Sequence, residues 1–458
     1  MIGRYSDFTI LNWTLNIGRW TLGITLSTLS MSPADPAIFG IPIDFILFGL
    51  TLLCVAVFHH HTMRVALAGL GTVVLYKIVF TGFKTGTGVI GFISHVGQEW
   101  VILANLFCLL TGFALLSRHF EESHVPAVLP RYLPHDWQAG FGLLVIVWVL
   151  SSFLDNIAAA LIGGAMAHEL YRAKVHIGYL AAIVAASNAG GAWSVLGDTT
   201  TTMMWISGVS PAQVFEAILP ATVALVVFGF PAAIKQQKYS PILRRARPHA
   251  QVDWVRMGIV GLILLLALVT NVVLNMKFRE QTNRFPFIGA GVWVAIFASA
   301  KIRRPDWQVV PLASKSAVFL LSLVLIASMM PVERLPAPFA HTTLWLGFLS
   351  AVFDNIPLTA LALRQDGYDW GPLAYAVGFG GSMTWFGSSA GVAISSIFPE
   401  ARSVGAWIKG GWFVVVAYLA GFIAMTLLIG WHSEQKGRSR HGPPWGGIEQ
   451  ATVMTNDQ

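Results

Sequence analysis

Two short segments, about two hundred residues apart, each place an aspartate and an asparagine inside an otherwise apolar stretch. The first holds Asp155 and Asn156, and the second holds Asp354 and Asn355. A carboxylate inside a bilayer costs about 3 kcal/mol on insertion scales, so such groups persist mainly where they bind an ion, a proton or a substrate. Because the pair occurs twice, the two segments predict a cation or proton site between two repeats.

Each half of the chain also has a glycine-rich polar segment after its Asp-Asn pair. The side chains that could supply oxygen ligands are Ser187, Asn188, Asp198, Thr199, Thr200, Ser382, Thr384 and Ser388. A glycine pair is followed six residues later by a third glycine in both halves: Gly190, Gly191 and Gly197, then Gly380, Gly381 and Gly387. Glycines at this density predict an unwound helix. Carbonyl groups and half-helix ends at such a break are suited to an ion.

The ligand types indicate which ion these segments would bind. Carboxylate, amide and hydroxyl oxygens are hard ligands suited to Na⁺ or Li⁺. Burial disfavours the charged form of a carboxyl group, so the same group can hold a proton until the cation arrives. One carboxylate visited alternately by the two ions is sufficient for exchange. Two carboxylates, one in each repeat, would allow more than one proton per cation.

The composition predicts an all-α polytopic membrane protein. Of its 458 residues, 55% are hydrophobic and only 11% are charged, against about 25% charged in an average soluble domain. At about 20 apolar residues per span, we expect about 11 transmembrane helices plus two re-entrant hairpins. We read the net charge of +7 as a topology signal, so nucleic acid is not an expected partner. Cys54 and Cys108 lack disulfide or metal-ligand spacing, and we expect no cofactor.

The apolar runs divide the chain into five units. They are an N-terminal helix (1–37), a first repeat (38–234), a basic cytoplasmic linker (235–251), a second repeat (252–432) and a polar tail (433–458) that we expect to be disordered. Each repeat has three helices, a hairpin, a broken helix and a closing helix. These make five crossings, an odd number, so the second repeat is expected to be inverted. The predicted ranges are 8–30, 38–58, 63–83, 98–117, 177–206 and 212–234, then 252–276, 285–300, 314–331, 371–397 and 404–432, with hairpins at 138–167 and 342–364 and a polar loop at 118–136.

Basic residues indicate which ends of the helices face the cytoplasm. With the linker inside, the first half places six basic residues in cytoplasmic loops and only Lys84 outside. The second half fits this rule less well, so the side of the C-terminus is left open.

The polar motifs together resemble a known family. The run from Ser187 to Trp205 resembles the signature of the NhaD-type sodium/proton antiporters of the ion transporter superfamily. Residues 380–395 and both Asp-Asn segments are similar to that family, and His95 to Glu99 are a weaker match. Over residues 95–430, the resemblance implies scaffold helices around a transport unit with two hairpins and two broken helices. It further implies a homodimer in the cytoplasmic (inner) membrane that exchanges Na⁺ or Li⁺ for protons.

Several alternatives are open at this stage. His95 and Glu99 fit a solvated helix start, with pH sensing as the second interpretation, and Asp198 fits a ligand or a helix cap. We expect Lys77, inside an apolar run, to extend toward the membrane surface. A carrier for di- or tricarboxylates or oxyanions is the alternative function, although an aspartate at each hairpin tip would repel an anion. We expect no enzyme activity, because Cys-His or Ser-His pairs at catalytic spacing are absent from the sequence.

Overall fold

The computed structural model describes residues 36–38, 40–58, 61–128, 133–134, 136–241, 251–277 and 284–433. The predicted helix at 8–30, the middle of the basic linker and nearly all of the polar tail lie outside the described residues. Within the described part, regular structure is helical apart from one short antiparallel pair of strands, β1 (Ala37–Ile38) and β2 (Ile41–Pro42).

The helices follow the same order in both halves of the chain. Those before the midpoint are α2 (Ile43–Val57), α3 (Thr62–Tyr76), η2 (Lys77–Thr81), α4 (Gly88–Glu122), α5 (Val125–Val128), α6 (Trp137–Ser151), α7 (Asn156–Leu170), α8 (Ile177–Ala192), α9 (Thr199–Ile206), α10 (Pro211–Phe215) and α11 (Ile218–Tyr239). Those after it are α12 (Trp254–Lys277), α13 (Phe287–Ser299), α14 (Val309–Ser328), η4 (Val332–Arg334), α15 (Ala340–Ser350), α16 (Asn355–Gln365), α17 (Trp370–Gly380), η5 (Gly381–Met383), α18 (Ser389–Ile397), η6 (Pro399–Arg402), α19 (Val404–Gly410) and α20 (Trp412–Leu428). Each half has a helix hairpin followed by a broken helix, in the predicted order.

Four of the described helical stretches are long and apolar enough to cross a membrane. They are Thr62–Thr81, Gly88–Glu122, Pro211–Tyr239 and Val309–Ser328, and the bent pair α19–α20 would make a fifth. Shorter apolar helices such as α6, α8 and α13 accompany them. The predicted class, an all-α polytopic membrane protein, is confirmed at this level. The finer count of about eleven spans with two re-entrant hairpins stays a prediction.

Two predicted helix boundaries are wrong. α4 begins ten residues earlier than predicted, at Gly88, and continues to Glu122 into the predicted polar loop. Arg118 pairs with Glu121 and Glu122, one turn further along the same helix, and such pairs support a helix beyond its apolar stretch. The predicted helix 404–432 instead bends by 60° between α19 and α20.

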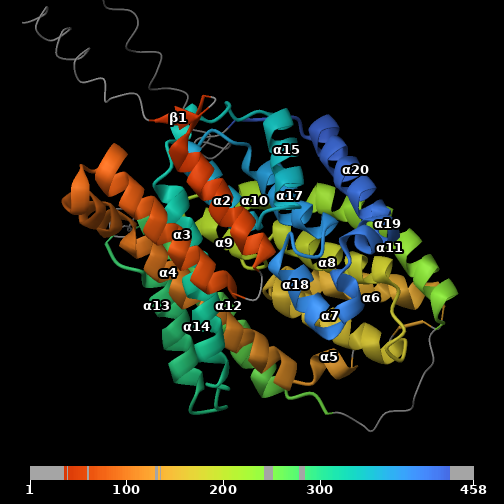
Figure 1. Ribbon diagram of the computed structural model, residues 1–458. Helices are drawn as coiled ribbons and strands as arrows, with labels where there is room; N and C mark the ends of the chain where they lie inside the picture. Colours follow the sequence, from red (N-terminus) through yellow and green to blue (C-terminus); the bar gives the residue numbers. More distant parts are fainter. Residues whose placement is uncertain are drawn as a thin grey trace, which may run out of the picture.

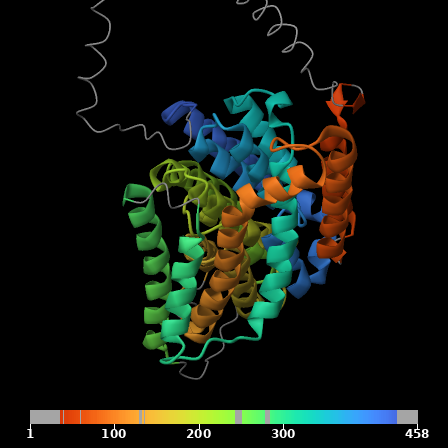
Figure 2. The same ribbon diagram turned by 90° about the vertical axis from the view of Figure 1, so that its left-hand side faces the viewer.

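The helices form two groups that lie side by side (Figures 1 and 2). The framework helices are α2, α3, α4, α12, α13 and α14, in which α4 packs against α12, α13 and α14. The core helices are α6–α11 and α15–α20, in which α8 packs against α6, α11 and α17. The two groups meet where α14 contacts α16 and where α4 contacts α9.

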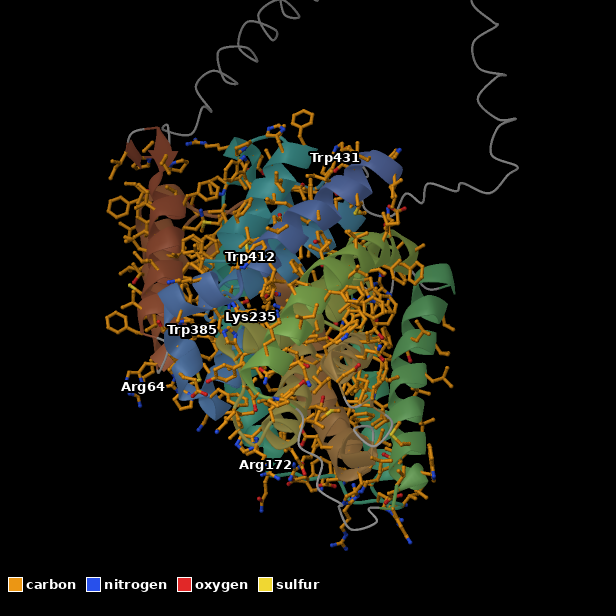
Figure 3. The ribbon with its side chains drawn as sticks, turned by 90° about the vertical axis from the view of Figure 1, so that its right-hand side faces the viewer. Arg64, Arg172, Lys235, Trp385, Trp412 and Trp431 are labelled. Carbon is orange, nitrogen blue, oxygen red and sulfur yellow. The ribbon has the colours of Figure 1, made fainter. Side chains whose placement is uncertain are left out.

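Basic and aromatic side chains mark the two ends of the molecule. Arg64 and Arg172 lie toward the lower end in Figure 3, and Trp431 lies near the upper end. α7 is at the lower end and α15 is at the upper end of Figure 1. The inverted arrangement of the two repeats stays a prediction.

Lys77 does not extend to the surface as predicted. Its side chain is buried in the π-helical turn η2, where its Nζ lies 3.3 Å from Oδ2 of Asp44 on α2. A charged side chain is tolerated there because it is paired with an opposite charge. The sequence analysis did not identify Asp44 as its partner.

The glycine pairs serve close packing in both halves, and the second pair also stands at the break, where Gly380 ends α17 and Gly381 begins η5. Gly190 and Gly191 lie inside α8, which ends at Ala192. A Cβ at Gly190 would collide with the backbone carbonyl of Trp148 on α6, and one at Gly380 would collide with that of Gly347 on α15. Each broken helix thus crosses its hairpin at backbone distance, which only glycine permits. The chain in the first half unwinds later than the sequence predicts, after Ala192.

Candidate functional site

The two hairpin turns have nearly identical backbone geometry. Asp155 is the N-cap of α7 with φ −53° and ψ 141°, and Asp354 is the N-cap of α16 with φ −53° and ψ 143°. Oδ2 of Asp155 accepts a hydrogen bond from the Ile157 amide at 3.3 Å, and Oδ1 of Asp354 accepts one from the Ile356 amide at 3.1 Å. A carboxylate that uses one oxygen for capping keeps a second oxygen for another partner.

The second oxygen of Asp354 has such a partner, whereas that of Asp155 faces a cavity. Oδ2 of Asp354 accepts a hydrogen bond from the Ser389 hydroxyl at 3.2 Å. Asp155 lines a cavity together with Thr199, the residue at the place in α9 that Ser389 takes in α18. The two hairpins are therefore alike in backbone and differ in the surroundings of their carboxylates.

The cap residues at the two helix breaks also have nearly identical backbone geometry. Asp198 caps α9 with φ −143° and ψ 146°, and Ser388 caps α18 with φ −142° and ψ 152°. Both side chains are buried. Asp198 accepts the Thr200 amide through Oδ1 at 3.1 Å, which leaves Oδ2 free of capping. Asp198 is thus a helix cap, one of its two predicted roles, and its second oxygen has a separate contact.

Asn188 is the centre of a buried neutral cluster formed by both halves. Its Oδ1 accepts a hydrogen bond from Nδ2 of Asn156 at 3.1 Å. Its own Nδ2 donates to Oγ of Ser382 at 2.9 Å and to Oγ of Ser388 at 3.1 Å. Four of the predicted site residues therefore meet in one place.

Asp198 and Asn355 form a second, charged contact between the halves. Nδ2 of Asn355 lies 3.2 Å from Oδ2 of Asp198. The position that corresponds to Asn188, two residues before the glycine pair, is Gly378 in the second half. A Cβ there would lie 3.6 Å from Oδ2 of Asp198. The second contact, beside the Asp198 carboxylate, therefore has no side chain in the place that Asn188 takes in the first contact.

Other predicted ligands hold the backbone instead of entering these contacts. The Ser187 hydroxyl donates to the Val184 carbonyl of its own helix at 2.9 Å. The Thr384 hydroxyl donates to the Ala351 carbonyl and accepts the Gly387 amide. Thr200 has a buried hydroxyl without a hydrogen-bond partner among the described residues. We conclude that Ser187 and Thr384 position the breaks.

Two serines near the hairpins were not singled out by the sequence analysis. The Ser151 hydroxyl donates to the Ser187 carbonyl at 2.5 Å, and the Ser350 hydroxyl donates to the Val377 carbonyl at 2.7 Å. Each bond ties the end of the first hairpin helix to the broken helix. The repeated serine before each Asp-Asn pair was the signal that could have revealed them.

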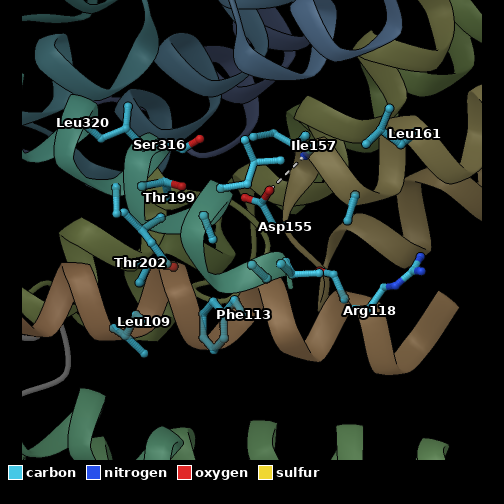
Figure 4. A pocket seen from close by; sticks show the side chains of 18 of the residues that line it. Leu109, Phe113, Arg118, Asp155, Ile157, Leu161, Thr199, Thr202, Ser316 and Leu320 are labelled. Carbon is cyan, nitrogen blue, oxygen red and sulfur yellow. Dashed lines mark hydrogen bonds between the residues drawn. The ribbon is translucent and has the colours of Figure 1, made fainter. Parts of the chain in front are cut away.

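A cavity of about 490 Å³ leads from Asp155 and Asp198 toward one end of the molecule. Its walls come from the framework helices α4 and α14 and from the core elements α7 and α9. Figure 4 shows Asp155 beside Ile157, with Thr199 and Ser316 across the cavity and Arg118 at one side. The site is therefore reached through a passage between the two groups of helices.

A network of charges surrounds the end of this cavity. Arg118 pairs with Asp306 at 3.1 Å and with Glu121 at 2.9 Å, all three of which line the cavity. Further out, the Arg303 guanidinium donates to Asp253 and holds the pKa of that carboxyl below its usual value. The acidic side chains at this end are therefore paired with arginines.

His95 and Glu99 are distant from this cavity and are not solvated. Both are buried, because α4 begins at Gly88 and places them in its second and third turns. Nε2 of His95 lies 2.8 Å from Oγ of Ser328 on α14, and Glu99 forms an ion pair with Arg364 on α16. The interpretation as a solvated helix start is wrong. The pH-sensing interpretation stays a prediction.

Comparison with known proteins agrees with the motifs. The chain is 27% identical to sodium/proton antiporter 1 of Arabidopsis thaliana over 62% of its length. It is 24% identical to the Na⁺/H⁺ antiporter NhaD of Vibrio parahaemolyticus over 56% of its length, and 25% identical to NhaD of Halomonas elongata over 64%. The relatives of this chain are sodium/proton antiporters, of which the bacterial ones carry the name NhaD. The predicted family resemblance is confirmed, although no family model matches the chain.

The coverage of these relatives differs. The match spans 55% of the Arabidopsis protein, and 72% and 69% of the Vibrio and Halomonas NhaD proteins. The aligned part is thus little more than half of the plant relative and over two thirds of the bacterial ones. The likeness to these antiporters and the apolar helices together indicate a multi-pass membrane protein.

The atoms at the site that could bind a cation are oxygens. Among the described residues, no group of three or more His, Cys, Asp or Glu side chains is placed to hold a metal ion. The contacts around Asn188 and Asp198 instead use amide, hydroxyl and carboxylate groups. Such hard donors fit an alkali cation better than a transition metal.

Proposed function

We propose that the protein exchanges Na⁺ for protons across a membrane, with Asp155, Asp198 and Asp354 as the groups that carry the exchanged charge. The observation behind this proposal is an imbalance of charge. In the part of the chain that the structure describes, none of the three carboxylates has a Lys, Arg or His partner within ion-pair distance. Asp198 is buried and Asp155 and Asp354 are half-buried, and carboxylates withdrawn from water without a basic partner need a proton or a bound cation for neutralisation.

The geometry allows one group to serve both ions. Asp198 uses Oδ1 as a cap and directs Oδ2 toward Asn355, next to the space at Gly378. A cation there would bind Oδ2 of Asp198 and displace any proton on the carboxylate, and the Asn355 amide, whose Nδ2 now donates to Oδ2, would turn its Oδ1 toward the ion. Asp155, which faces the cavity, would pass ions between that site and the Arg118 end.

The finer parts of the proposal follow the family resemblance. They are use of Li⁺ beside Na⁺, two inverted repeats with re-entrant hairpins at 138–167 and 342–364, a homodimer, and the cytoplasmic (inner) membrane. The matching caps of Asp155 with Asp354, and of Asp198 with Ser388, support the repeats. The position of Arg64 and Arg172 at the same end as α7 supports a cytoplasmic side there.

An organic anion carrier is less consistent with the site. A helix N-terminus attracts an anion through its free amides and its dipole. The N-termini of α7, α16 and α9 are each capped by an aspartate of this chain. An anionic substrate would meet negative charge at each of them.

The test is transport by the purified protein in proteoliposomes with an imposed pH gradient. Addition of NaCl or LiCl should collapse the gradient, whereas KCl and citrate should have no effect. Collapse by citrate alone would move the function to an anion carrier, and no response to any ion would contradict transport by this site.

Proton competition provides a second test. If one carboxylate serves both ions, raising the pH removes a competitor, so the apparent Km for Na⁺ should fall as the pH rises. With one competing proton the change approaches about tenfold per pH unit where the group is protonated. A Km that is independent of pH, with exchange intact, would show that separate groups bind the two ions.

A further inference from the structure

We propose that the ion pair between Glu99 and Arg364 is a latch that holds the core helices against the framework helices at the end opposite the cavity. Glu99 is on α4, a framework helix, and Arg364 is at the end of α16, a core helix. The side chain of Glu99 is 8% exposed and that of Arg364 is 32% exposed. The pair therefore joins the two groups from a largely buried position.

The latch and the cavity lie at opposite ends of the same boundary. On α4 the cavity is lined from Leu106 to Glu121, and Glu99 lies seven residues before Leu106, about 10 Å further along the helix. On α14 the lining ends at Leu320, and Ser328, the partner of His95, lies about 12 Å beyond it. One end of the boundary is open and the other is held by polar contacts.

α16 connects the latch to the candidate site. Asn355, at its first turn, contacts Asp198, and Arg364 lies nine residues later, about 13 Å along the helix. Any movement of α16 away from α4 therefore has to break the ion pair and shift Asn355 relative to the framework. The latch thus favours the conformation in which the Arg118 end is open.

The first half has an uncharged residue at the place of Arg364. Nine residues after Asn156, the corresponding position is Ala165, an exposed alanine. α7 therefore offers no charge at the position from which α16 forms the latch. An ion pair at this position of one hairpin alone would bias the two conformations of a transport cycle unequally.

The inference rests on the proposed transport function only in requiring that the cavity opens and closes. Its test measures conformation directly, without Na⁺ or a pH gradient. Two single-cysteine reporters are made after replacing Cys54 and Cys108 by alanine. Ser316→Cys reports the cavity, which Ser316 lines, and Ala360→Cys reports the buried side of α16, where Ala360 is 4% exposed. Labelling rates with a water-soluble maleimide are compared in proteoliposomes.

Arg364→Gln should raise the labelling rate of Ala360→Cys about tenfold, within the range of typical conformational coupling. It should lower the rate of Ser316→Cys by a smaller factor, because that reporter follows the conformation that is already populated. Glu99→Gln should have a weaker effect than Arg364→Gln. It leaves the half-exposed Arg364 unpaired, whereas Arg364→Gln leaves the buried Glu99 carboxylate unpaired. The double variant leaves neither charge unpaired, so it is a control for misfolding caused by an unpaired charge in the single variants. Its labelling rate should lie between those of the single variants and that of the native protein.

The matched control is the exposed pair Lys84 and Glu333, which joins nearby parts of the framework side. Lys84→Gln removes one charge of an ion pair, as Arg364→Gln does, but at an exposed position where such pairs contribute little. Its labelling rates should equal those of the native protein. Unchanged rates in both Arg364→Gln and Glu99→Gln, or equal changes in Lys84→Gln, would overturn the latch. If the latch variants shift labelling while Na⁺ fails to drive exchange, the proposed substrate is wrong and the latch stands.

Discussion

The two halves of the site share a backbone but not a charge. The helix breaks have matching caps, yet the first is Asp198 and the second is Ser388. In the helix that precedes each break, the position two residues before the glycine pair is Asn188 in the first half and Gly378 in the second. Because each break faces the other half, Asn188 meets Ser388, and Asp198 lies beside Gly378. One contact is neutral and joined by three hydrogen bonds, and the other contains a carboxyl group beside a glycine that has room for one methyl group.

This difference teaches that repeated motifs need not give equivalent sites. A fully hydrogen-bonded neutral cluster rigidifies the meeting point of the halves. A carboxylate that has one oxygen outside the cap can accept an ion. We infer that the first contact holds the two breaks together while the second binds the cation.

The largest expected effect concerns the hairpin carboxylates, where the halves should behave alike. Asp155→Asn and Asp354→Asn should each reduce exchange below detection, because each removes a charge that a proton or cation balances. Both variants should still insert, since removal of the charge lowers the insertion cost. The measurement is Na⁺-driven collapse of a pH gradient at equal protein content. Native exchange in both variants would remove the hairpins from the mechanism.

The breaks should respond unequally, and this prediction tests the comparison directly. Asp198→Asn should abolish exchange. Ser388→Ala loses two neutral hydrogen bonds, those from the Asn188 side chain and the Gly391 amide, and should retain measurable exchange. A neutral hydrogen bond contributes about 1 kcal/mol, or about a fivefold change. The two variants are assayed side by side for the apparent Km for Na⁺. If Ser388→Ala is as inactive as Asp198→Asn, the neutral cluster also binds the transported ion.

Substitutions of two glycines distinguish a role in helix packing from a role in Na⁺ binding. Gly190→Ala would place a Cβ against the Trp148 carbonyl and should destabilise the protein by about 1–3 kcal/mol. At Gly378 the nearest atom would be Cβ of Ala192 at 3.4 Å, so Gly378→Ala should fold normally. It should nevertheless raise the apparent Km for Na⁺ several-fold, since the methyl group would occupy space beside Asp198. Thermal unfolding in detergent measures the first effect and transport the second. A stable Gly190→Ala or a native Km in Gly378→Ala would contradict these roles.

The smallest expected effect is that of the two serine anchors. Ser151→Ala and Ser350→Ala each remove one buried hydrogen bond and should lower the free energy of unfolding by about 1 kcal/mol. The two losses should be equal within error if the halves share a backbone frame. Thermal shift of each variant, with Ser152→Ala at an exposed position as control, makes the comparison. Unequal losses would show that the frames differ.

Much of the fold follows from local pattern. Apolar runs predicted the order of helices and hairpins, because the length and hydropathy of a span are properties of the segment alone. The errors occurred where other forces decide. Salt bridges along one helix extended α4 beyond its apolar stretch, and Lys77 was held inside by Asp44, 33 residues away. Neither partner choice is visible in a local window of sequence.

The sequence by itself determined the chemistry of the site, namely two Asp-Asn pairs, an extra aspartate and hard oxygen donors around glycine-rich breaks. Those residue types carry their cost and their ligand preference wherever they lie in the membrane. Only the tertiary structure decided which of them meet. Asn355 contacts Asp198, Asn188 contacts Ser388, and Glu99 contacts Arg364 across 157, 200 and 265 residues of sequence. Such contacts arise from packing between helices that are distant in the sequence, and no local pattern of residues specifies that packing.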